Sequence, residues 1–418
     1  MRENKEDSQT REVQAGRKRQ SSHSKEANPN IIQQHNTPKK IRGLAVSFLH
    51  TVGQMEDPRT RPCDYPLSEI LFIAVCSVLC GTESHEDMAM FGEAQIDWFR
   101  QFVPLKNGVP SHDTFRRVLM LLKPGSLSDA CNEMFQGPHI DKQGKHIAID
   151  GKASRGCYNV KGQSLLNMVS AWDTDRGICL GHVVTKNDEG KETGEYNAIP
   201  KLIEQLDVKD TLVTIDAGGC YAEITGSIVS GGGDYAITLK ENQPKLHEMT
   251  KGVFDEHDRN DFANVASYRK TNRGHGRVEE RTYYAVPVGT DDKRWEKWPK
   301  LSTLVMGKFR RETGGKTTEF IRYYISSLPS KDVERLGQSL RGHWGIENGL
   351  HWVLDVTFGE DANRTRRGNG AENLSILRRM ALGMLNQVKG KKTISNVKFQ
   401  AAVDPNFRTK MMNKFLMR

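Results

Sequence analysis

The chain has 418 residues, 36% of them hydrophobic and 27% charged, which is enough for two or three domains that each bury a core. Its longest apolar run, residues 70–80, is about half of the ~20 residues that a membrane span requires, and the amino terminus lacks a signal-peptide core. These features exclude a membrane-spanning class and predict a cytoplasmic protein. Seven cysteines without a CxxC pair argue against a disulfide framework.

The net charge of +9 is concentrated at the two ends of the chain. Residues 1–42 carry ten Lys or Arg against five Asp or Glu, and residues 386–418 carry eight against one. Basic ends suit a polyanion such as nucleic acid, although a solubilising charge run has the same composition. We expect a disordered basic tail over residues 1–42 and a basic C-terminal tail over residues 391–418.

Helical patterns follow the first tail and predict a small helical domain over residues 43–135. Residues 67–79 are largely apolar, residues 85–102 are amphipathic, and Ser111 can cap a helix over residues 112–122. In that last helix Arg116 and Arg117 could face phosphates as part of a recognition helix. An ordinary surface helix would give the same pattern.

An α/β pattern begins at residue 146 and predicts a catalytic domain over residues 143–390. Strands expected at residues 146–150, 165–172 and 178–185 follow one another directly, which implies an antiparallel meander. Strands at 211–216 and 235–240 alternate with helices, which implies parallel pairing. This order predicts a ribonuclease-H-like mixed sheet with its first and fourth strands side by side. Residues 264–327 predict a β-rich insertion.

One acid stands out in the helix expected over residues 333–354. A period of 3.6 residues places Glu347 in the middle of a mostly apolar stripe. The other members of that stripe are Val333, Leu336, Leu340, Trp344, His351 and Leu354. A buried carboxylate is costly unless it is paired, protonated or bound to a cation. An ion pair with an arginine of the core would explain a buried glutamate at position 347 as well as a catalytic role would.

Two further acids end expected strands, Asp150 the first and Asp216 the fourth. If those strands are neighbours, both carboxylates stand at one edge of the sheet, where the later helix would add Glu347. Three converging carboxylates repel one another unless cations neutralise them. Oxygen ligands favour Mg²⁺ or Mn²⁺, and two such ions suit phosphodiester cleavage and transfer. We therefore expect Asp150, Asp216 and Glu347 to be metal ligands and catalytic residues.

Five segments also carry a resemblance to a known family. They are AIDGKASRG, TIDAGGCYAEI, GGDYAITLKENQ, GHGRVEER and RGHWGIENGLHWVLDVTFGEDANRTRRGNGAEN, of which the last is the most specific. The chain resembles, over about residues 41–387, the DDE transposases of bacterial insertion sequences, of the H-repeat-associated (ISAs-type) family. In that family the DDE acids are metal ligands, and they map onto Asp150, Asp216 and Glu347. Gly218 and Tyr221 depart from the family pattern, which leaves the acids intact.

The resemblance implies a DNA transposase with a helical amino-terminal domain of the kind associated with the family. Such an enzyme binds the inverted-repeat ends of its element, hydrolyses a phosphodiester, and uses the freed 3′-hydroxyl to attack target DNA. It is expected to use two ions, Mg²⁺ or Mn²⁺, and to lie on the bacterial nucleoid when bound to DNA. A homodimer on DNA is expected because two ends must be joined.

Seven basic residues are candidate DNA contacts: Lys152, Arg155, Lys240, Arg341, Arg364, Arg366 and Arg367. The first two follow Asp150. The last three lie in a loop-like segment after the helix that carries Glu347, called the glutamate helix below, where phosphates would be held. His343 and His351 are expected to be core or DNA-contacting residues, because three carboxylates already suffice for metal. Two alternatives remain open, a metal-dependent nuclease of the same fold and a catalytically idle DNA-binding remnant.

Overall fold

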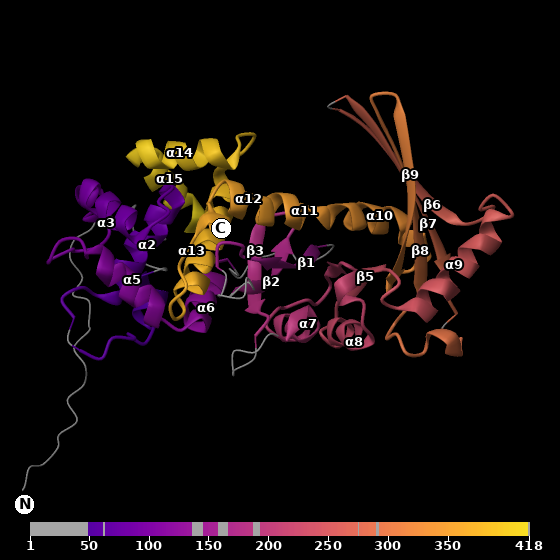
Figure 1. Cartoon of the computed structure of the whole chain (residues 1–418), viewed down its shortest axis with the longest axis horizontal. Coiled ribbons are helices and arrows are strands. Elements are labelled where there is room, and N and C mark those ends of the chain that lie inside the picture. Colours follow the sequence, from indigo (N-terminus) through magenta and orange to yellow (C-terminus); the bar gives the residue numbers. More distant parts are fainter. Residues whose placement is uncertain are drawn as a thin grey trace, which may run out of the picture. The chain divides into compact units, whose positions relative to one another are not determined.

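The computed structural model in Figure 1 describes residues 49–61, 63–135, 145–157, 166–186, 193–274, 276–289 and 292–416. All of them belong to one compact unit, Thr37–Arg418. The disordered tail expected over residues 1–42 lies outside the described residues. Among the helices described, no single one is long and apolar enough to cross a membrane. The pair α2 and α3 passes such a test only when taken together, and a bend of 97° separates its two members.

A helical layer combines the first and the last helices of the described chain (Figure 1). At its centre α13, buried from Asn373 to Leu385, packs against α2, α5, α6, α14 and α15. The helices of this layer are α2 (Leu67–Cys80), α3 (His85–Ala94), α4 (Ile96–Phe99), α5 (His112–Leu121), α6 (Pro124–Phe135), α13 (Gly370–Val388), α14 (Ile394–Val403) and α15 (Pro405–Leu416).

The basic C-terminal segment is part of this layer, since most of residues 391–416 form α14 and α15. Arg408 is fully buried. Its guanidinium donates to the Ala401 carbonyl at 2.9 Å and to Gln95 Oε1 at 2.6 Å, and it lies 4.2 Å from the ring centroid of Trp98. The charge pattern alone assigned this segment as a basic tail, but at least one of its arginines serves packing and is not available to a polyanion.

A nine-stranded mixed sheet runs in the order β3-β2-β1-β4-β5-β9-β8-β7-β6. The meander β1–β2–β3 is antiparallel, whereas β1, β4 and β5 are parallel to one another. This topology confirms the predicted ribonuclease-H-like mixed sheet, with the first and fourth strands adjacent. The strands are β1 (His146–Ala153), β2 (Asn167–Asp173), β3 (Ile178–Val184), β4 (Leu212–Ile215), β5 (Asp234–Leu239), β6 (Ala266–Gly274), β7 (Arg277–Pro287), β8 (Thr303–Thr313) and β9 (Lys316–Ser326).

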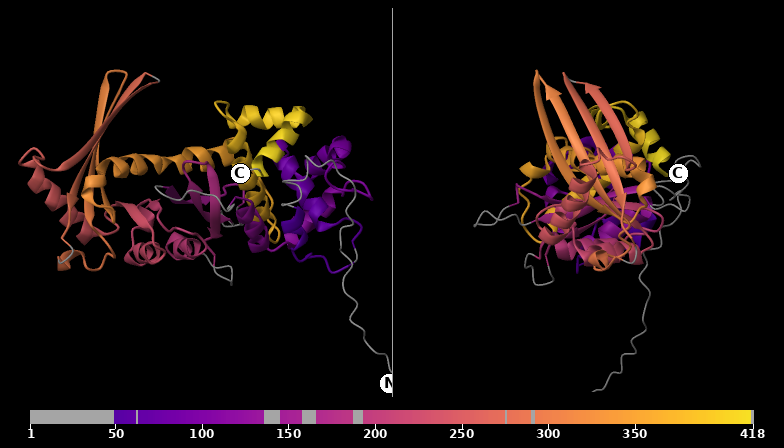
Figure 2. Two further views of the ribbon diagram at one scale, coloured as in Figure 1. Left: turned by 180° about the vertical axis from the view of Figure 1, so that it is seen from behind. Right: turned by 90° about the vertical axis from the view of Figure 1, so that its right-hand side faces the viewer.

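The β-rich region continues the sheet, because β9 pairs with β5 in antiparallel fashion. Seen from behind in Figure 2, its long strands project beyond the helices, and a chain of short helices runs from them across the sheet. One face of the sheet is covered by α7 (Gly194–Glu204), α8 (Ala222–Ser230) and α9 (Pro244–Asp258). The other face is covered by α10 (Val333–Gly342), α11 (Trp344–Ile346), a π-helical turn (Glu347–His351) and α12 (Trp352–Val356).

The expected burial of Glu347 is wrong. Its side chain is 56% exposed, and Trp344 is 46% exposed. Most of the expected stripe is buried, and only between its two ends do Ile346 and Leu350 face the sheet in place of Trp344 and Glu347. Glu347 therefore lies where the sheet borders solvent. Because its side chain is not buried, burial is no argument that it binds a cation.

Candidate active site

Asp150 does not end β1 as expected, because the strand continues to Ala153, but it lies where the pairing of β1 with β4 stops and Asp216 follows β4. The parallel ladder between β1 and β4 pairs Ile149 with Ile215, and the two aspartates are the next residues along each chain. Asp216 starts a tight turn, in which its Oδ1 accepts a hydrogen bond from the Gly218 backbone N–H at 2.8 Å. One carboxylate oxygen of Asp216 is thus used by the turn and the other is available.

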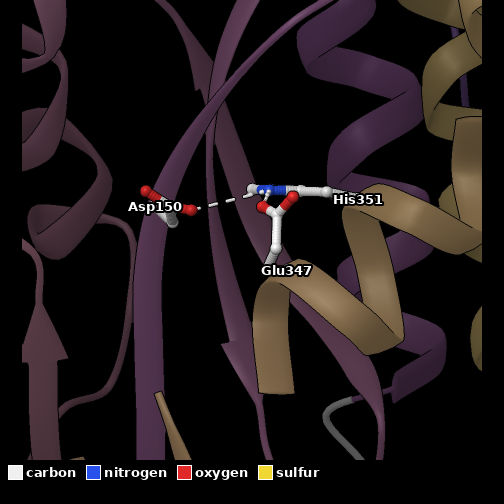
Figure 3. Close-up of side chains that lie close together, drawn as sticks. All are labelled: Asp150, Glu347 and His351. Atoms are coloured by element: carbon white, nitrogen blue, oxygen red, sulfur yellow. Dashed lines mark hydrogen bonds and ion pairs between the residues drawn. The ribbon is translucent and has the colours of Figure 1, made fainter. Parts of the chain in front are cut away.

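Glu347 approaches Asp150 from the π-helical turn, together with His351 (Figure 3). The Nδ1 atom of His351 lies 3.0 Å from Glu347 Oε2 and 3.5 Å from Asp150 Oδ2. One ligand atom from each of these three residues lies within 4.8 Å of the other two. The histidine is buried, as expected of a core residue, and it also lies beside the two carboxylates.

His343 lies in the core. Its Nδ1 is 3.0 Å from the Thr214 hydroxyl, which in turn is 2.7 Å from His146 Nε2. This hydrogen-bonded chain fastens the glutamate helix to β4 and β1. His343 is therefore a structural residue and not a candidate metal ligand.

Glu195, at the start of α7, is a fourth acid at this edge that sequence reasoning missed. A Cβ atom added to Gly151 would collide with its carboxylate, and one added to Gly218 would lie 3.2 Å from its Oε2. The Glu195 carboxylate thus fills the space beside both aspartates. The only signal in the sequence was a glycine soon after each aspartate, which leaves room for another side chain.

The crowded acids disturb one another's ionisation. Burial, followed by the charges of Asp216, Glu195 and Glu347, raises the pKa of Asp150 to about 7. Burial and Asp216 also raise the pKa of Glu195. A divalent cation among these oxygens would remove the repulsion, so the residues fit a hard metal ion.

His351 is neutral at this site near pH 7. Burial lowers its pKa to about 4, although the hydrogen bond to Glu347 acts in the opposite direction. Its Nδ1 can therefore either donate a proton to the two carboxylates or, in the other tautomer, present a lone pair to a metal. Among the residues that the structure describes, the buried Nε2 has no hydrogen-bond partner.

Comparison with known proteins identifies the family. Residues 141–384 match the family model described as the transposase DDE domain, and residues 49–134 match the one described as DDE_Tnp_1-associated. The chain belongs to the DDE transposase family. Membership implies DNA as the substrate and the use of divalent metal ions.

Named relatives agree with this assignment. "Putative transposase YncI" of Escherichia coli O157:H7 is 36% identical over 351 residues, which is 82% of this chain and 88% of that protein. "H repeat-associated putative transposase YhhI" of Escherichia coli K12 is 33% identical over 84% of this chain and 93% of its own length. "Putative protein YbfL" of the same strain is 34% identical over 82% and 91%.

Lys152 does not face solvent in this DDE family member. Its side chain is only 7% exposed, and its Nζ lies 2.6 Å from Asp355, 3.3 Å from Asp361 and 3.5 Å from Glu360. The ammonium therefore joins β1 to the segment that follows Glu347. This corrects the interpretation of Lys152 as a phosphate contact, because three carboxylates already occupy it.

A second buried cation completes this ionic network. The Arg379 guanidinium of α13 lies 3.3 Å from Glu360 Oε1, and the Ser375 hydroxyl donates to the same oxygen. Although burial favours the neutral acid, Arg379 and Lys152 lower the pKa of Glu360 to about 2. The network holds β1, the segment after α12 and α13 together.

The other six basic candidates lie on the surface. Arg155 has a side chain that is 79% exposed, and its backbone N–H donates to Asp361 at 2.9 Å. Lys240 is exposed just beyond β5, and Arg341 is exposed on α10. The exposed loop arginines are Arg364, Arg366 and Arg367. All six side chains are accessible to an external polyanion, although Arg155 Nε also lies 3.8 Å from Asp361 Oδ2.

Proposed function

We propose that this protein is a transposase that cuts DNA at the ends of its insertion sequence and joins the freed 3′ end to target DNA. The observation that carries the proposal is the position of Asp150, which lies beside Asp216 of the neighbouring strand and has a carboxylate oxygen within 4.8 Å of one from Glu347 of the glutamate helix. Burial and then the neighbouring negative charges raise the pKa of Asp150, and a bound cation would offset both effects.

Asp150, Asp216 and Glu347 are proposed as the residues that would hold two Mg²⁺ or Mn²⁺ ions. Glu195, beside the two aspartates, would be a further ligand. Two divalent ions bound there supply activation of the attacking oxygen and stabilisation of the leaving oxygen. Glu347, being half exposed, leaves the edge accessible to a DNA strand.

His351 is assigned as the residue that orients Glu347. Mg²⁺ prefers oxygen ligands, so with that ion the neutral imidazole keeps its Nδ1 proton and donates it to the Glu347 carboxylate 3.0 Å away. Mn²⁺ also accepts imidazole nitrogen, which would bring His351 into direct coordination.

The proposed reaction consists of two displacements at phosphorus. In the first, a water oxygen bonds to phosphorus and the bond to the 3′ oxygen breaks, leaving a 3′-hydroxyl. In the second, that hydroxyl oxygen attacks a target phosphodiester, and the displaced target oxygen takes up the proton. The chain's part is to hold both strands at the acidic edge, with Arg155, Lys240 and Arg341 among the proposed phosphate contacts.

Nicking of a labelled duplex that carries the element's own end tests the proposal. With Mg²⁺ or Mn²⁺, the protein should cut at the end of the element, and EDTA, Glu347→Gln or Asp216→Asn should abolish cutting while DNA binding persists. Cutting at any sequence without joining would identify a nuclease. Binding without cutting by the unaltered protein would identify a catalytically idle remnant. Joining of two ends further implies a homodimer, which sedimentation of the DNA complex would detect.

A further inference from the structure

Two basic segments that are far apart in the chain line one cavity of about 490 Å³. Arg116 and Arg117 come from α5, in the region that matches the DDE_Tnp_1-associated model. The others, from the loop between α12 and α13, are Arg364, Arg366 and Arg367. Sequence reasoning considered these segments separately, whereas the structure makes them two sides of one cavity.

Hydrogen bonds fix the two sides relative to each other. The Asn369 backbone N–H donates to the Met120 carbonyl at 3.0 Å, and its side-chain amide donates to the Leu122 carbonyl at 3.0 Å. Asn373, fully buried, donates to the carbonyls of Leu119 at 2.8 Å and Leu122 at 2.9 Å. The loop is therefore anchored to the carboxyl end of α5, and the arginines of both segments are held around a preformed space.

The lining is strongly positive. Five arginines stand against one glutamate, Glu83. Arg116 is paired with Asp113 at 2.6 Å, whereas the structure shows no ion pair between any described carboxylate and the other four arginines. Burial, and in part the positive charges of Arg116 and Arg378, lower the pKa of His85, which lines the same cavity. Guanidinium groups that outnumber the nearby carboxylates suit phosphate oxygens, which they bind in a bidentate manner.

The loop also connects this cavity to the catalytic strand. The Cys157 thiol, just beyond β1, donates to the Thr365 carbonyl at 3.2 Å. A Cβ atom added to Gly156 would collide with the carbonyls of Asp361 and Asn363. The segment that carries Arg364 and Arg366 is thus packed directly against the continuation of the strand that carries Asp150.

We infer that this cavity binds the sugar–phosphate backbone of the DNA that the active site cuts, held jointly by α5 and the loop after α12. The inference rests on the proposed function and adds to it a phosphate site shared by the helical layer and the catalytic domain. Because phosphate contacts position DNA without reading its sequence, the cavity contributes equally to binding of end and unrelated duplex.

A double-mutant cycle in DNA binding tests the shared site. The full chain carrying Asp216→Asn, which blocks cutting, is titrated onto a fluorescent end duplex with Arg117→Gln, Arg366→Gln or both. Each change should weaken binding about tenfold and reduce the salt-dependence slope by about 1. The Kd of the double variant should differ by about twofold or more from the value expected if the two single effects were additive in free energy, because both arginines hold the same backbone segment. The matched controls Lys123→Gln and Lys297→Gln, both exposed and outside the cavity, should change binding little.

Each other outcome overturns the inference. If the arginine variants bind DNA as tightly as the lysine controls, or if their effects on binding free energy simply add, a shared site is excluded. In that case nicking and joining by the unaltered chain would still support the proposed function. Variants that lose binding of inorganic phosphate but keep DNA affinity would show a free anion to be the occupant. No DNA binding by the unaltered chain would remove the proposed function, and this site with it. Unchanged melting temperatures of the variants would confirm that the fold is intact.

Discussion

Replacing Lys152 with methionine should destabilise the fold without directly removing a DNA contact. The change leaves the carboxylates of Asp355, Glu360 and Asp361 without the ammonium that lies 2.6 to 3.5 Å from them. Methionine has nearly the same length, so the loss is one of charge and not of volume.

The magnitude follows from the exposure of the three acids. Removing one partner of a buried ion pair costs about 3–5 kcal/mol. Glu360 is 2% exposed and keeps Arg379, whereas Asp355 and Asp361 are 29% and 26% exposed and can regain water. We therefore expect a loss near the lower limit, about 3 kcal/mol in the free energy of unfolding.

Urea unfolding followed by tryptophan fluorescence measures this loss directly. Arg155→Gln is the matched control, since that side chain is 79% exposed and its replacement should stay within about 0.5 kcal/mol. If Lys152→Met unfolded like the unaltered protein but bound DNA more weakly, Lys152 would be a phosphate contact, and the structural role assigned to it would be refuted.

Three further predictions concern the acids and the histidine. The pKa of Glu360, about 2 against an ordinary 4.5, means that its ionised form stabilises the fold fully above pH 4.5, and that this stabilisation fades as pH falls toward 2. Glu360→Gln should therefore lower the melting temperature at pH 7 and much less at pH 3; an equal loss at both would contradict the assignment. His351→Ala should weaken Mn²⁺ binding about 10–100-fold by calorimetry, and unchanged affinity would place His351 outside the metal site. Glu195→Gln should weaken the second of two Mn²⁺ sites counted by electron paramagnetic resonance, whereas an unchanged count and affinity would exclude it as a ligand.

The sheet edge could be predicted because local patterns determine it. Two runs of apolar residues each end in an acid, and strands alternate with helices between them. These patterns are sufficient to pair Ile149 with Ile215 and to place Asp150 beside Asp216. Predicting this strand pairing requires only the order of the strands, which hydrophobic periodicity indicates.

The missed features depend on contacts between distant parts of the chain. The partners of Lys152 lie about 200 residues later, and no pattern in the sequence marks them. Glu195 follows a segment without periodicity, so nothing directed it toward the aspartates. His351 was visible on the helix, but its function depends on the carboxylate of Asp150. The period that identified Glu347 assigned most of its stripe to the core correctly, but only packing against the sheet shows that Ile346 and Leu350 are buried in place of Trp344 and Glu347.

The most direct test of the account is strand transfer from a precut end. A duplex of the element's end that already carries a free 3′-hydroxyl is incubated with the protein, Mg²⁺ and a target duplex, beside the same substrate ending in a 3′-deoxy nucleotide. The account predicts a covalently joined product with the 3′-hydroxyl substrate alone, and none with Asp216→Asn. Target cleavage that proceeds equally with both ends, without a joined product, would contradict it.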